Sequence, residues 1–495
     1  MSWQTFAGLM FAAYCALAAA WQTGSGPRVS SVARVNPSAY RVAFPPAANA
    51  AASQSLADAA AADAAASLVG YDSFVRTNPR SDRFETKRFH HVELYCADAT
   101  SAAARFSHAL GMDLVARSDP PAERSGFTSL CVCSGEVRFV LSAPQVHELP
   151  TPPDALQSQF GFDPQLALAF METHGGLAVR AVAIEVSDVD GAFGACVSGG
   201  GRGVLEPRGL IDLDGTIRGA MAEVALYGDT VLRLVSLDEG WDGDFLPGYS
   251  PVRTRGRSSS AGAYGVERID HIVGNVRRLL PTVRHLKAMT GYHEFAEFTS
   301  EDVGTIDSGL NSMVLASNDE RVLLPVNEPT YGTRRRSQIE TYLVHHRGEG
   351  VQHIALFCTD IFETVAAVRA AAGRGGFSLM DPPSAEYYDE LPARIGDALP
   401  AEDLERAREL GLLVDRDDQG VLIQVFTRPL GDRPTLFLEL IQRVGCMVEG
   451  EAGEGEAVQA GGCGGFGKGN FKELFKSVEQ FERGLEGGED AEDRE

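Results

Sequence analysis

Strand-like and helix-like patterns of apolar and polar residues follow one another twice along the chain. Residues 88–119, RFHHVELYCADATSAAARFSHALGMDLVARSD, predict a strand, an amphipathic helix and a second strand. Residues 268–299, RIDHIVGNVRRLLPTVRHLKAMTGYHEFAEFT, predict the same succession. Two later pairs of segments also correspond, namely 178–197 with 350–368 and 229–236 with 433–442. This internal repeat predicts an α+β protein with two tandem domains, each built of paired β-α-β-β-β modules that form one curved sheet around a cavity.

Changes in composition mark the limits of the two domains. We expect the first domain at 84–250 and the second at 264–446, joined by a linker at 251–263 that is rich in Gly, Ser and Arg. Residues 1–82 are rich in Ala and show no pattern that requires a core, so they are predicted to be a disordered leader. Beyond the second domain the sequence predicts an acidic Gly-rich hinge, an amphipathic lid helix and an acidic tail, at 447–469, 470–485 and 486–495.

The leader has features of a targeting segment. An apolar run occupies 6–21, arginines are interspersed with Ser, Ala and Pro, and the first acidic residue is Asp58. This composition is typical of a transit peptide or a secretory-type leader, with an unprocessed Ala-rich leader as the alternative. The apolar run is too short to predict a membrane span.

Charge and cysteine usage narrow the class of partner. The 495 residues carry a formal net charge of −24, which disfavours nucleic acid and anionic membrane surfaces as general partners. The eight cysteines include no C-x-x-C pair. Neither a cysteine zinc site nor a disulfide framework is therefore expected, and a reducing compartment fits best.

Two histidines and one glutamate lie in predicted strands of the second domain. His271 is the second residue of the segment DHIVGNV. His353 is a polar residue within the strand-like segment GVQHIALF, and Glu439 is the one charged residue of the apolar run LFLELI. A buried ionised carboxylate is costly unless it is paired or binds a metal. Two imidazoles and one carboxylate on three strands form the ligand set of the facial triad that binds Fe(II). Zinc accepts the same residue types, but usually with the histidines close together on a helix.

The first domain lacks this set. At the corresponding positions it has His91, Ala181 and either Leu234 or Arg233, so no intact metal site is expected there.

Another predicted strand of the second domain, VLIQVF, suggests an aromatic ligand. Gln424 and Phe426 share one face of VLIQVF by the period-2 alternation of a strand. An amide beside an aromatic ring suits a phenol, because the ring packs and the hydroxyl is hydrogen-bonded. A core glutamine satisfied by the backbone is the alternative.

The glycine run GGCGGFGKGN at 461–470 imitates two nucleotide-binding motifs. It fits G-x-G-x-x-G, but that motif needs a preceding strand and a surrounding β-α-β unit, whereas this run follows an acidic linker. It also fits G-x-x-x-x-G-K, but position 469 is Gly where the phosphate loop requires Ser or Thr. We therefore expect no nucleotide and interpret the run as a hinge for the helix that follows, with a plain structural helix as the alternative.

Several motifs together resemble a known family. The segments DHIVGNV, GVQHIAL, LVDRDDQGVLIQVFTRPLGDRPTLFLELIQRVGCM and GGCGGFGKGNFKELFKSVE closely resemble the plant or algal form of the 4-hydroxyphenylpyruvate dioxygenase family, within the vicinal oxygen chelate superfamily. The resemblance is close over 264–485 and looser over 84–250. It implies a non-haem enzyme with one Fe(II) per chain, held by His271, His353 and Glu439.

The resemblance also implies a reaction and a set of site residues. The reaction converts 4-hydroxyphenylpyruvate and O₂ to homogentisate and CO₂, in tyrosine and phenylalanine breakdown and in the supply of plastoquinone and tocopherol precursors. The implied substrate-binding residues are Ser312, Asn327, Gln338, Gln352, Gln424, Phe426 and Phe471, and the implied gate residues are Gly465, Phe466, Gly467, Asn470 and Phe471. Simple alternation, however, points Gln352 away from the face that carries His353. A homodimer, in the cytoplasm or imported into a plastid, is further implied.

Three other functions remain open from the sequence. Hydroxymandelate synthase uses the same substrate and iron but oxidises the benzylic carbon. Extradiol ring-cleaving dioxygenases use the same class of triad, although they do not call for the C-terminal glycine-plus-helix element. A metal-free binding module is the alternative from a different class, and an intact His/His/Glu set disfavours it.

Overall fold

The computed structural model describes residues 68–118, 126–145, 159–252, 264–303, 309–331, 336–449, 457–471 and 473. The first 67 residues of the expected leader, most of the linker at 251–263 and the tail at 486–495 lie outside these ranges. So does the predicted helix at 470–485, except for three of its residues, Asn470, Phe471 and Glu473. Within the described residues, no helix combines the length and apolarity needed to cross a bilayer.

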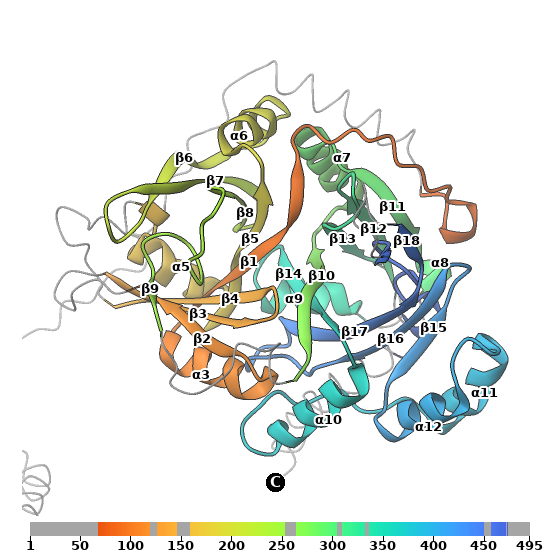
Figure 1. Cartoon of the computed structure of the whole chain (residues 1–495). Helices are drawn as coiled ribbons and strands as arrows, with labels where there is room; N and C mark the ends of the chain where they lie inside the picture. The colour runs from red at the N-terminus through yellow and green to blue at the C-terminus, as the bar shows by residue number, and fades with distance from the viewer. Residues whose placement is uncertain are drawn as a thin grey trace, which may run out of the picture. The chain divides into compact units, whose positions relative to one another are not determined.

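The first half of the described chain forms one nine-stranded sheet, with strand order β6-β7-β8-β5-β1-β4-β3-β2-β9 (Figure 1). The elements of its first module are β1 (Thr86–Cys96), α3 (Ala99–Leu110), β2 (Asp113–Arg117), β3 (Phe127–Ser134) and β4 (Val137–Pro144). The remaining elements are α5 (Pro164–His174), β5 (Leu177–Val186), α6 (Val189–Ser198), β6 (Gly203–Ile211), β7 (Ile217–Tyr227), β8 (Thr230–Leu237) and β9 (Ser250–Pro251).

The second half forms an eight-stranded sheet of the same design, with strand order β11-β12-β13-β10-β14-β17-β16-β15. Its first module comprises β10 (Val266–Asn275), α7 (Leu279–Thr290), β11 (His293–Phe298), α8 (Ser300–Val303), β12 (Leu310–Ala316) and β13 (Leu323–Pro329). After α9 (Gln338–His345), its second module comprises β14 (Gly350–Cys358), α10 (Ile361–Ala372), α11 (Ala385–Ile395), α12 (Ala401–Glu409), β15 (Leu413–Arg416), β16 (Gly420–Phe426) and β17 (Phe437–Gly445).

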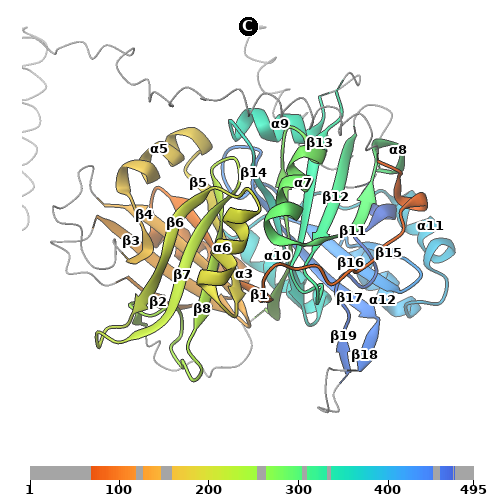
Figure 2. The same cartoon turned by 90° about the horizontal axis from the view of Figure 1, so that it is seen from above.

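The two sheets share one topology, which confirms the predicted α+β fold of paired modules. In each, the first strands of the two modules pair antiparallel at the centre, as β1 with β5 and β10 with β14. Each central strand pairs in parallel with the last strand of one module, β4 and β8 in the first sheet and β13 and β17 in the second. The helices lie around the outside of the curled sheets (Figures 1 and 2).

Local sequence explains where the module helices begin and how they join the halves. The Asp98 carboxylate accepts a hydrogen bond from the backbone N–H of Ser101 at the start of α3, and Asp360 caps α10 in the same way. The buried face of α3 carries Phe106, whose ring lies edge-on to Phe377 with centroids 5.1 Å apart. An apolar core that includes both rings thus spans the two halves.

The first sheet has an arginine where the second has its glutamate. His91 and Arg233 pair with Ala183 from either side, as His271 and Glu439 pair with Ala355. The corresponding residue is therefore Arg233 rather than Leu234. The buried Arg233 guanidinium donates to Glu223 at 2.8 Å and to Glu93 at 2.5 Å, and it lies 3.0 Å from His91 Nε2. A fixed positive charge at this point disfavours a cation.

Arg233→Met is expected to destabilise the first half, because it leaves Glu93 and Glu223 buried without their partner. Loss of one partner of a buried ion pair costs about 3–5 kcal/mol. Urea denaturation should show this loss as a lower unfolding midpoint, while the Fe(II) affinity of the folded protein stays unchanged. A variant with wild-type stability would contradict the structural role given to this cluster.

Residues 68–82 are not disordered, so the leader prediction is wrong for this part. The backbone N–H groups of Val69 and Gly70 donate to Glu297 Oε1, and the Tyr71 ring stacks on Phe298 with centroids 5.1 Å apart. A short 3₁₀ helix, η2 (Tyr71–Ser73), lies in this segment. The sequence missed it because its partners lie more than two hundred residues away, so no local periodicity marks it.

The described residues 447–449 and 457–469 are more structured than the predicted hinge. Strand β18 (Met447–Glu449) pairs antiparallel with β19 (Ala457–Gln459), and a short 3₁₀ helix, η3 (Lys468–Asn470), follows. Cys446 and Cys463 form a disulfide, with their Cα atoms 5.8 Å apart. This pair departs from the expectation that the chain has no disulfide framework. The two cysteines are 17 residues apart, so they do not form the C-x-x-C pair on which that expectation rested. The segment 461–471, called the gate segment below, is thereby tied to the end of β17.

Candidate metal centre and substrate pocket

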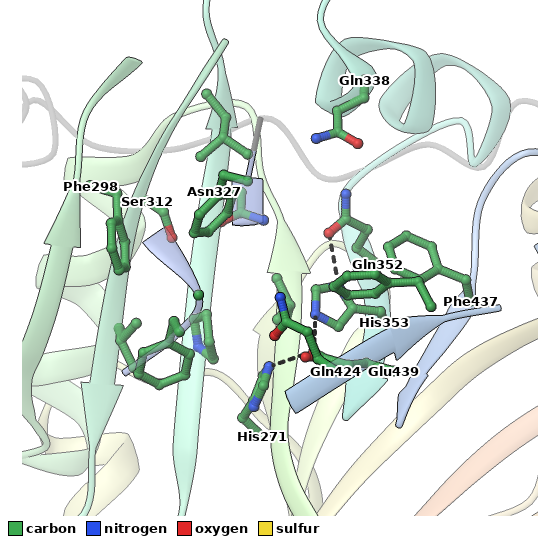
Figure 3. A pocket seen from close by; sticks show the side chains of 18 residues that line it. His271, Phe298, Ser312, Asn327, Gln338, Gln352, His353, Gln424, Phe437 and Glu439 are labelled. Carbon is green, nitrogen blue, oxygen red and sulfur yellow. Dashed lines mark hydrogen bonds and ion pairs between the residues drawn. The ribbon is translucent and has the colours of Figure 1, made fainter. Parts of the chain in front are cut away.

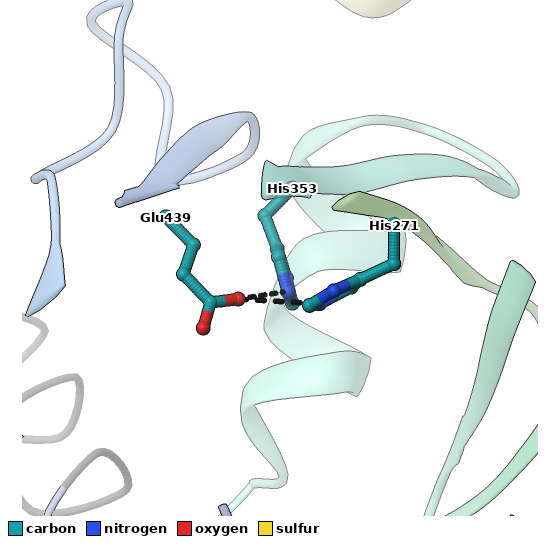
Figure 4. A group of neighbouring side chains, drawn as sticks. All are labelled: His271, His353 and Glu439. Carbon is teal, nitrogen blue, oxygen red and sulfur yellow. Dashed lines mark ion pairs between the residues drawn. The ribbon is translucent and has the colours of Figure 1, made fainter. Parts of the chain in front are cut away.

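Three adjacent strands, β10, β14 and β17, bring His271, His353 and Glu439 to one point (Figure 4). The strand register explains why. His271 and Glu439 pair with Ala355 from either side, and His353 lies two residues before Ala355 on the same face. Glu439 Oε2 lies 3.2 Å from His271 Nε2 and 3.4 Å from His353 Nε2. All three side chains are buried.

The other ring nitrogen of each histidine has a partner supplied by the preceding residue. His271 Nδ1 donates to Asp270 Oδ1 at 2.8 Å, and His353 Nδ1 donates to Gln352 Oε1 at 3.0 Å. In this tautomer the Nε2 lone pair of each ring points at the shared position, as it does in metal-binding histidines.

β-Bulges make these partners possible. In the pairing of β10 with β14, the register skips Asp270 on one strand and Gln352 on the other. An extra residue in a bulge lets two consecutive side chains point to the same side. The conflict that alternation raised for Gln352 is thereby resolved, since Gln352 lines the same pocket as His353.

The donor set fits a divalent metal ion. Ligand atoms about 2.1 Å from an ion and at right angles to one another lie about 3 Å apart, close to the 3.2 and 3.4 Å between Glu439 Oε2 and the two histidine Nε2 atoms. Burial by itself raises the pKa of Glu439, but His271 and His353 outweigh it and hold that pKa at about 2. The carboxylate is therefore ionised at neutral pH. Burial also lowers the pKa of His353, which favours the neutral ring that a metal requires.

A pocket opens directly over these three residues (Figure 3). Ser312 on β12 and Asn327 on β13 lie on one wall, and Gln352 on β14 and Gln424 on β16 lie on the other. The remaining predicted substrate residues also line it, namely Gln338, Phe426 and Phe471. The seven predicted substrate residues thus gather around one cavity, as the resemblance implied.

The chain is similar to known proteins over most of its length. No protein-family model matches it. The 4-hydroxyphenylpyruvate dioxygenase of Plectranthus scutellarioides is 53% identical over 433 residues, which are 88% of this chain and 97% of the relative. That of Arabidopsis thaliana is 50% identical over 434 residues, 87% of this chain and 95% of the relative. The chain belongs to the 4-hydroxyphenylpyruvate dioxygenase family.

More distant relatives agree with this membership. The 4-hydroxyphenylpyruvate dioxygenase of Neurospora crassa is 35% identical over 408 residues, 80% of this chain and 92% of the relative. Among solved structures, a triple mutant of 4-hydroxymandelate synthase from Streptomyces coelicolor superposes with a TM-score of 0.64 at 23% identity, covering 80% of this chain and 99% of its own. This last likeness supports the fold alone.

Three of the five predicted gate residues lie at the pocket of this 4-hydroxyphenylpyruvate dioxygenase family member. Phe466, Gly467 and Phe471 line it, whereas Gly465 and Asn470 do not. Asn470 is buried elsewhere, where its Oδ1 accepts a hydrogen bond from the Tyr387 hydroxyl at 2.8 Å. The gate segment therefore presents its aromatic side chains to the cavity and is anchored through its polar ones.

The glycines of the gate segment permit close approach as well as sharp turns. Gly467 has φ +74°, and a Cβ there would lie 2.7 Å from Gln424 Nε2. Gly464 has φ +73°, and a Cβ there would lie 2.8 Å from the backbone of Val421. Only glycine adopts this conformation easily and leaves room for these neighbours. The run thus lets the gate segment lie directly on β16.

Four residues of the site, two aromatic and two charged, were not predicted from the sequence. Phe298 and Phe437 line the pocket, and the Phe437 ring stacks on His353 with centroids 4.9 Å apart. Period-2 alternation along β17 places Phe437 on the same face as Glu439, so the sequence held a signal for this residue. Asp270 and Arg443 lie behind His271, and only the strand register reveals them.

Proposed function

We propose that the chain converts 4-hydroxyphenylpyruvate and O₂ to homogentisate and CO₂, with one Fe(II) per chain held by His271, His353 and Glu439. The observation that carries this proposal is the buried triad at the base of a pocket lined by amides and aromatic rings. Relatives at 50–53% identity that carry the name of this dioxygenase support it.

The pocket offers separate partners for the two ends of such a substrate. When bound, the ferrous ion supplies the redox chemistry that O₂ activation requires and the positive charge that attracts a 2-oxo acid. The rings of Phe298, Phe426 and Phe471 provide apolar surface for a phenyl ring and keep water away from it. The amide of Gln424 can hydrogen-bond its hydroxyl and fix its orientation.

The chemistry needs no second organic substrate. Oxidative decarboxylation of the 2-oxo acid side chain releases CO₂, and both atoms of O₂ are retained between the new carboxylate and the new ring hydroxyl. Migration of the side chain then restores the aromatic ring. The protein's part is to orient the ring beside the triad and to exclude water.

Identification of the product tests the proposal against its alternatives. Anaerobic protein loaded with Fe(II) and 4-hydroxyphenylpyruvate is exposed to O₂, and the products are separated by chromatography and identified by mass. Homogentisate is expected. 4-Hydroxymandelate, no turnover of this substrate, or ring opening of a catechol offered in its place would each support a different function.

Gln424→Leu is expected to raise the KM for 4-hydroxyphenylpyruvate or lower kcat, so that kcat/KM falls by roughly 10- to 100-fold, because one or two hydrogen bonds are lost. Fe(II) affinity should stay within about two-fold of wild type, since the ring nitrogens of the two metal-binding histidines have Asp270, Gln352 and Glu439 as their partners, and not Gln424. Steady-state kinetics and anaerobic titration measure the two quantities. A loss of iron with unchanged KM would refute a substrate-binding role.

We also propose that the chain forms a homodimer and that its N-terminal leader directs import into a plastid, with a cytoplasmic location as the alternative. The composition of the leader supports import, and the family resemblance supports the dimer. Light scattering of the purified protein tests the dimer. Sequencing the N-terminus of protein isolated from its own cells tests processing, and an intact Met1 would contradict cleavage on import.

A further inference from the structure

Arg443 is buried behind the metal centre and joins two parts of the molecule. Its Nε donates to Asp270 Oδ2 at 2.9 Å, and its Nη2 donates to Asp270 Oδ1 at 2.7 Å. The same carboxylate accepts the hydrogen bond from His271 Nδ1. The Arg443 side chain is fully excluded from solvent. The orientation of the His271 ring thus depends on Asp270, which a two-pronged bond from Arg443 holds in place.

The remaining donors of Arg443 point to the gate segment. Its Nη1 donates to the carbonyl oxygens of Cys463 and Gly465, the latter at 2.7 Å. The guanidinium also lies over the Phe466 ring, 5.6 Å from its centroid. That ring in turn lies edge-on to His271, with centroids 5.2 Å apart. One guanidinium therefore contacts both the support of a metal ligand and the backbone that places an aromatic side chain over the pocket.

We infer that Arg443 is a positioning residue that couples the position of the gate segment to the orientation of His271 and thereby to metal binding. With the gate segment in place, the two carbonyl groups hold the guanidinium in the orientation that Asp270 requires. When the gate segment moves away, Arg443 loses two acceptors and Asp270 loses a rigid partner. The coupling is reciprocal, so bound metal must hold the gate segment in place to the same extent. The inference rests on the proposed Fe(II) site.

A nearby arginine offers a matched control. Arg268 Nη1 lies 3.4 Å from Asp270 Oδ2, so it also contributes positive charge beside this carboxylate. Its side chain is about a third exposed, and its guanidinium lies over the Phe357 ring. No contact of Arg268 with the gate segment is seen among the described residues. If Arg443 acted only through its positive charge, replacing either arginine would weaken metal binding and the ability of bound metal to hold the gate segment in place, with the larger effect at Arg443. If Arg443 couples the gate segment to His271, only its replacement, of the two, abolishes that ability.

The test compares wild type with Arg443→Lys, Asp270→Asn and Arg268→Met, each as the full chain. Anaerobic titration with Fe(II) gives the metal Kd. Trypsin cleavage after Lys468, followed by mass spectrometry with and without Fe(II), reports how far bound metal holds the gate segment in place. We expect Fe(II) to slow this cleavage in wild type by at least about five-fold.

In Arg443→Lys the Kd should rise roughly 10- to 100-fold, the usual effect of losing a group that orients a metal-bound histidine. Lysine keeps the charge but cannot reproduce the fork that binds Asp270 and two carbonyls together. The protection by Fe(II) at Lys468 should fall to about one-fold. Asp270→Asn breaks the same connection from its other end and should also lose protection, which keeps the test valid if one variant fails to fold. Arg268→Met should keep the protection and a Kd within about two-fold of wild type.

Full protection in both Arg443→Lys and Asp270→Asn would overturn the coupling, whatever their Kd. An unchanged Kd in Arg443→Lys would overturn its positioning of His271. Neither readout depends on turnover. If wild type binds Fe(II) and shows the coupling but forms no homogentisate, the proposed reaction is wrong and the coupling stands. If homogentisate forms but protection is alike in all variants, the reaction stands and the coupling is wrong.

Discussion

Glu439→Ala is expected to abolish homogentisate formation and to remove measurable Fe(II) binding at micromolar metal. The variant deletes the ionised oxygen that lies within 3.4 Å of both histidine Nε2 atoms, and no other acidic group of the described residues belongs to the cluster. Its effect should exceed the roughly 10- to 100-fold loss of affinity that follows removal of a residue that only orients a ligand. His353→Ala should behave alike, since it removes a second donor from the same point.

The first half of the chain supplies the control for this prediction. His91 occupies the position that corresponds to His271, but it faces Arg233 instead of a carboxylate. His91→Ala should therefore leave one Fe(II) per folded chain. Metal analysis after gel filtration, together with an oxygen-consumption assay, measures both effects. Full turnover in His353→Ala, or loss of iron in His91→Ala, would show that the metal centre is assigned to the wrong residues.

Ending the chain after Gly465 is expected to lower kcat/KM by at least about 100-fold while Fe(II) still binds. The truncation removes Phe466 and Phe471, which line the pocket, and so admits water to the reacting centre. It keeps the Cys463 carbonyl group and turns that of Gly465 into the C-terminal carboxylate, whose oxygens can still accept from Arg443, so the support of His271 remains. Iron affinity should therefore change by only a few-fold.

A chain that ends at Leu485 is the control for this truncation. It lacks only the acidic tail 486–495 and keeps the predicted lid helix, so its kcat/KM should match that of the full chain. Substantial turnover by the chain that ends at Gly465 would mean that the gate segment is not needed to close the pocket. Comparable losses in the two truncations would assign the effect to the tail instead.

Most of the fold and the three metal ligands could be predicted from the internal repeat in the sequence. Duplicated patterns gave the two sheets, and polar breaks in apolar strands pointed to His353 and Glu439, because a strand period of two is simple to read. The family relationship is confirmed by relatives at 50–53% identity. The roles of the individual residues in the pocket stay predictions, although the structure brings the seven substrate residues to one cavity.

Features that depend on strand register, or on contacts between segments far apart in the chain, could not be predicted from the sequence. Because of a bulge at Gln352, its side chain lies on the same face as His353, whereas strict alternation predicts the opposite face. A second bulge, at Asp270, places a carboxylate next to the His271 ring. Bulges leave no periodic signal in a single sequence. The packing of Tyr71 on Phe298 and the bond between Cys446 and Cys463 depend on chain segments that meet only in the folded protein.

Anaerobic Fe(II) titration followed by admission of O₂ and 4-hydroxyphenylpyruvate tests the central claim most directly. The account predicts one tightly bound Fe(II) per chain and the formation of one homogentisate and one CO₂ for each O₂ consumed. Iron should be lost, and homogentisate with it, when Glu439 is replaced by alanine. Homogentisate formation by the Glu439→Ala protein, or 4-hydroxymandelate as the product of wild type, would contradict it.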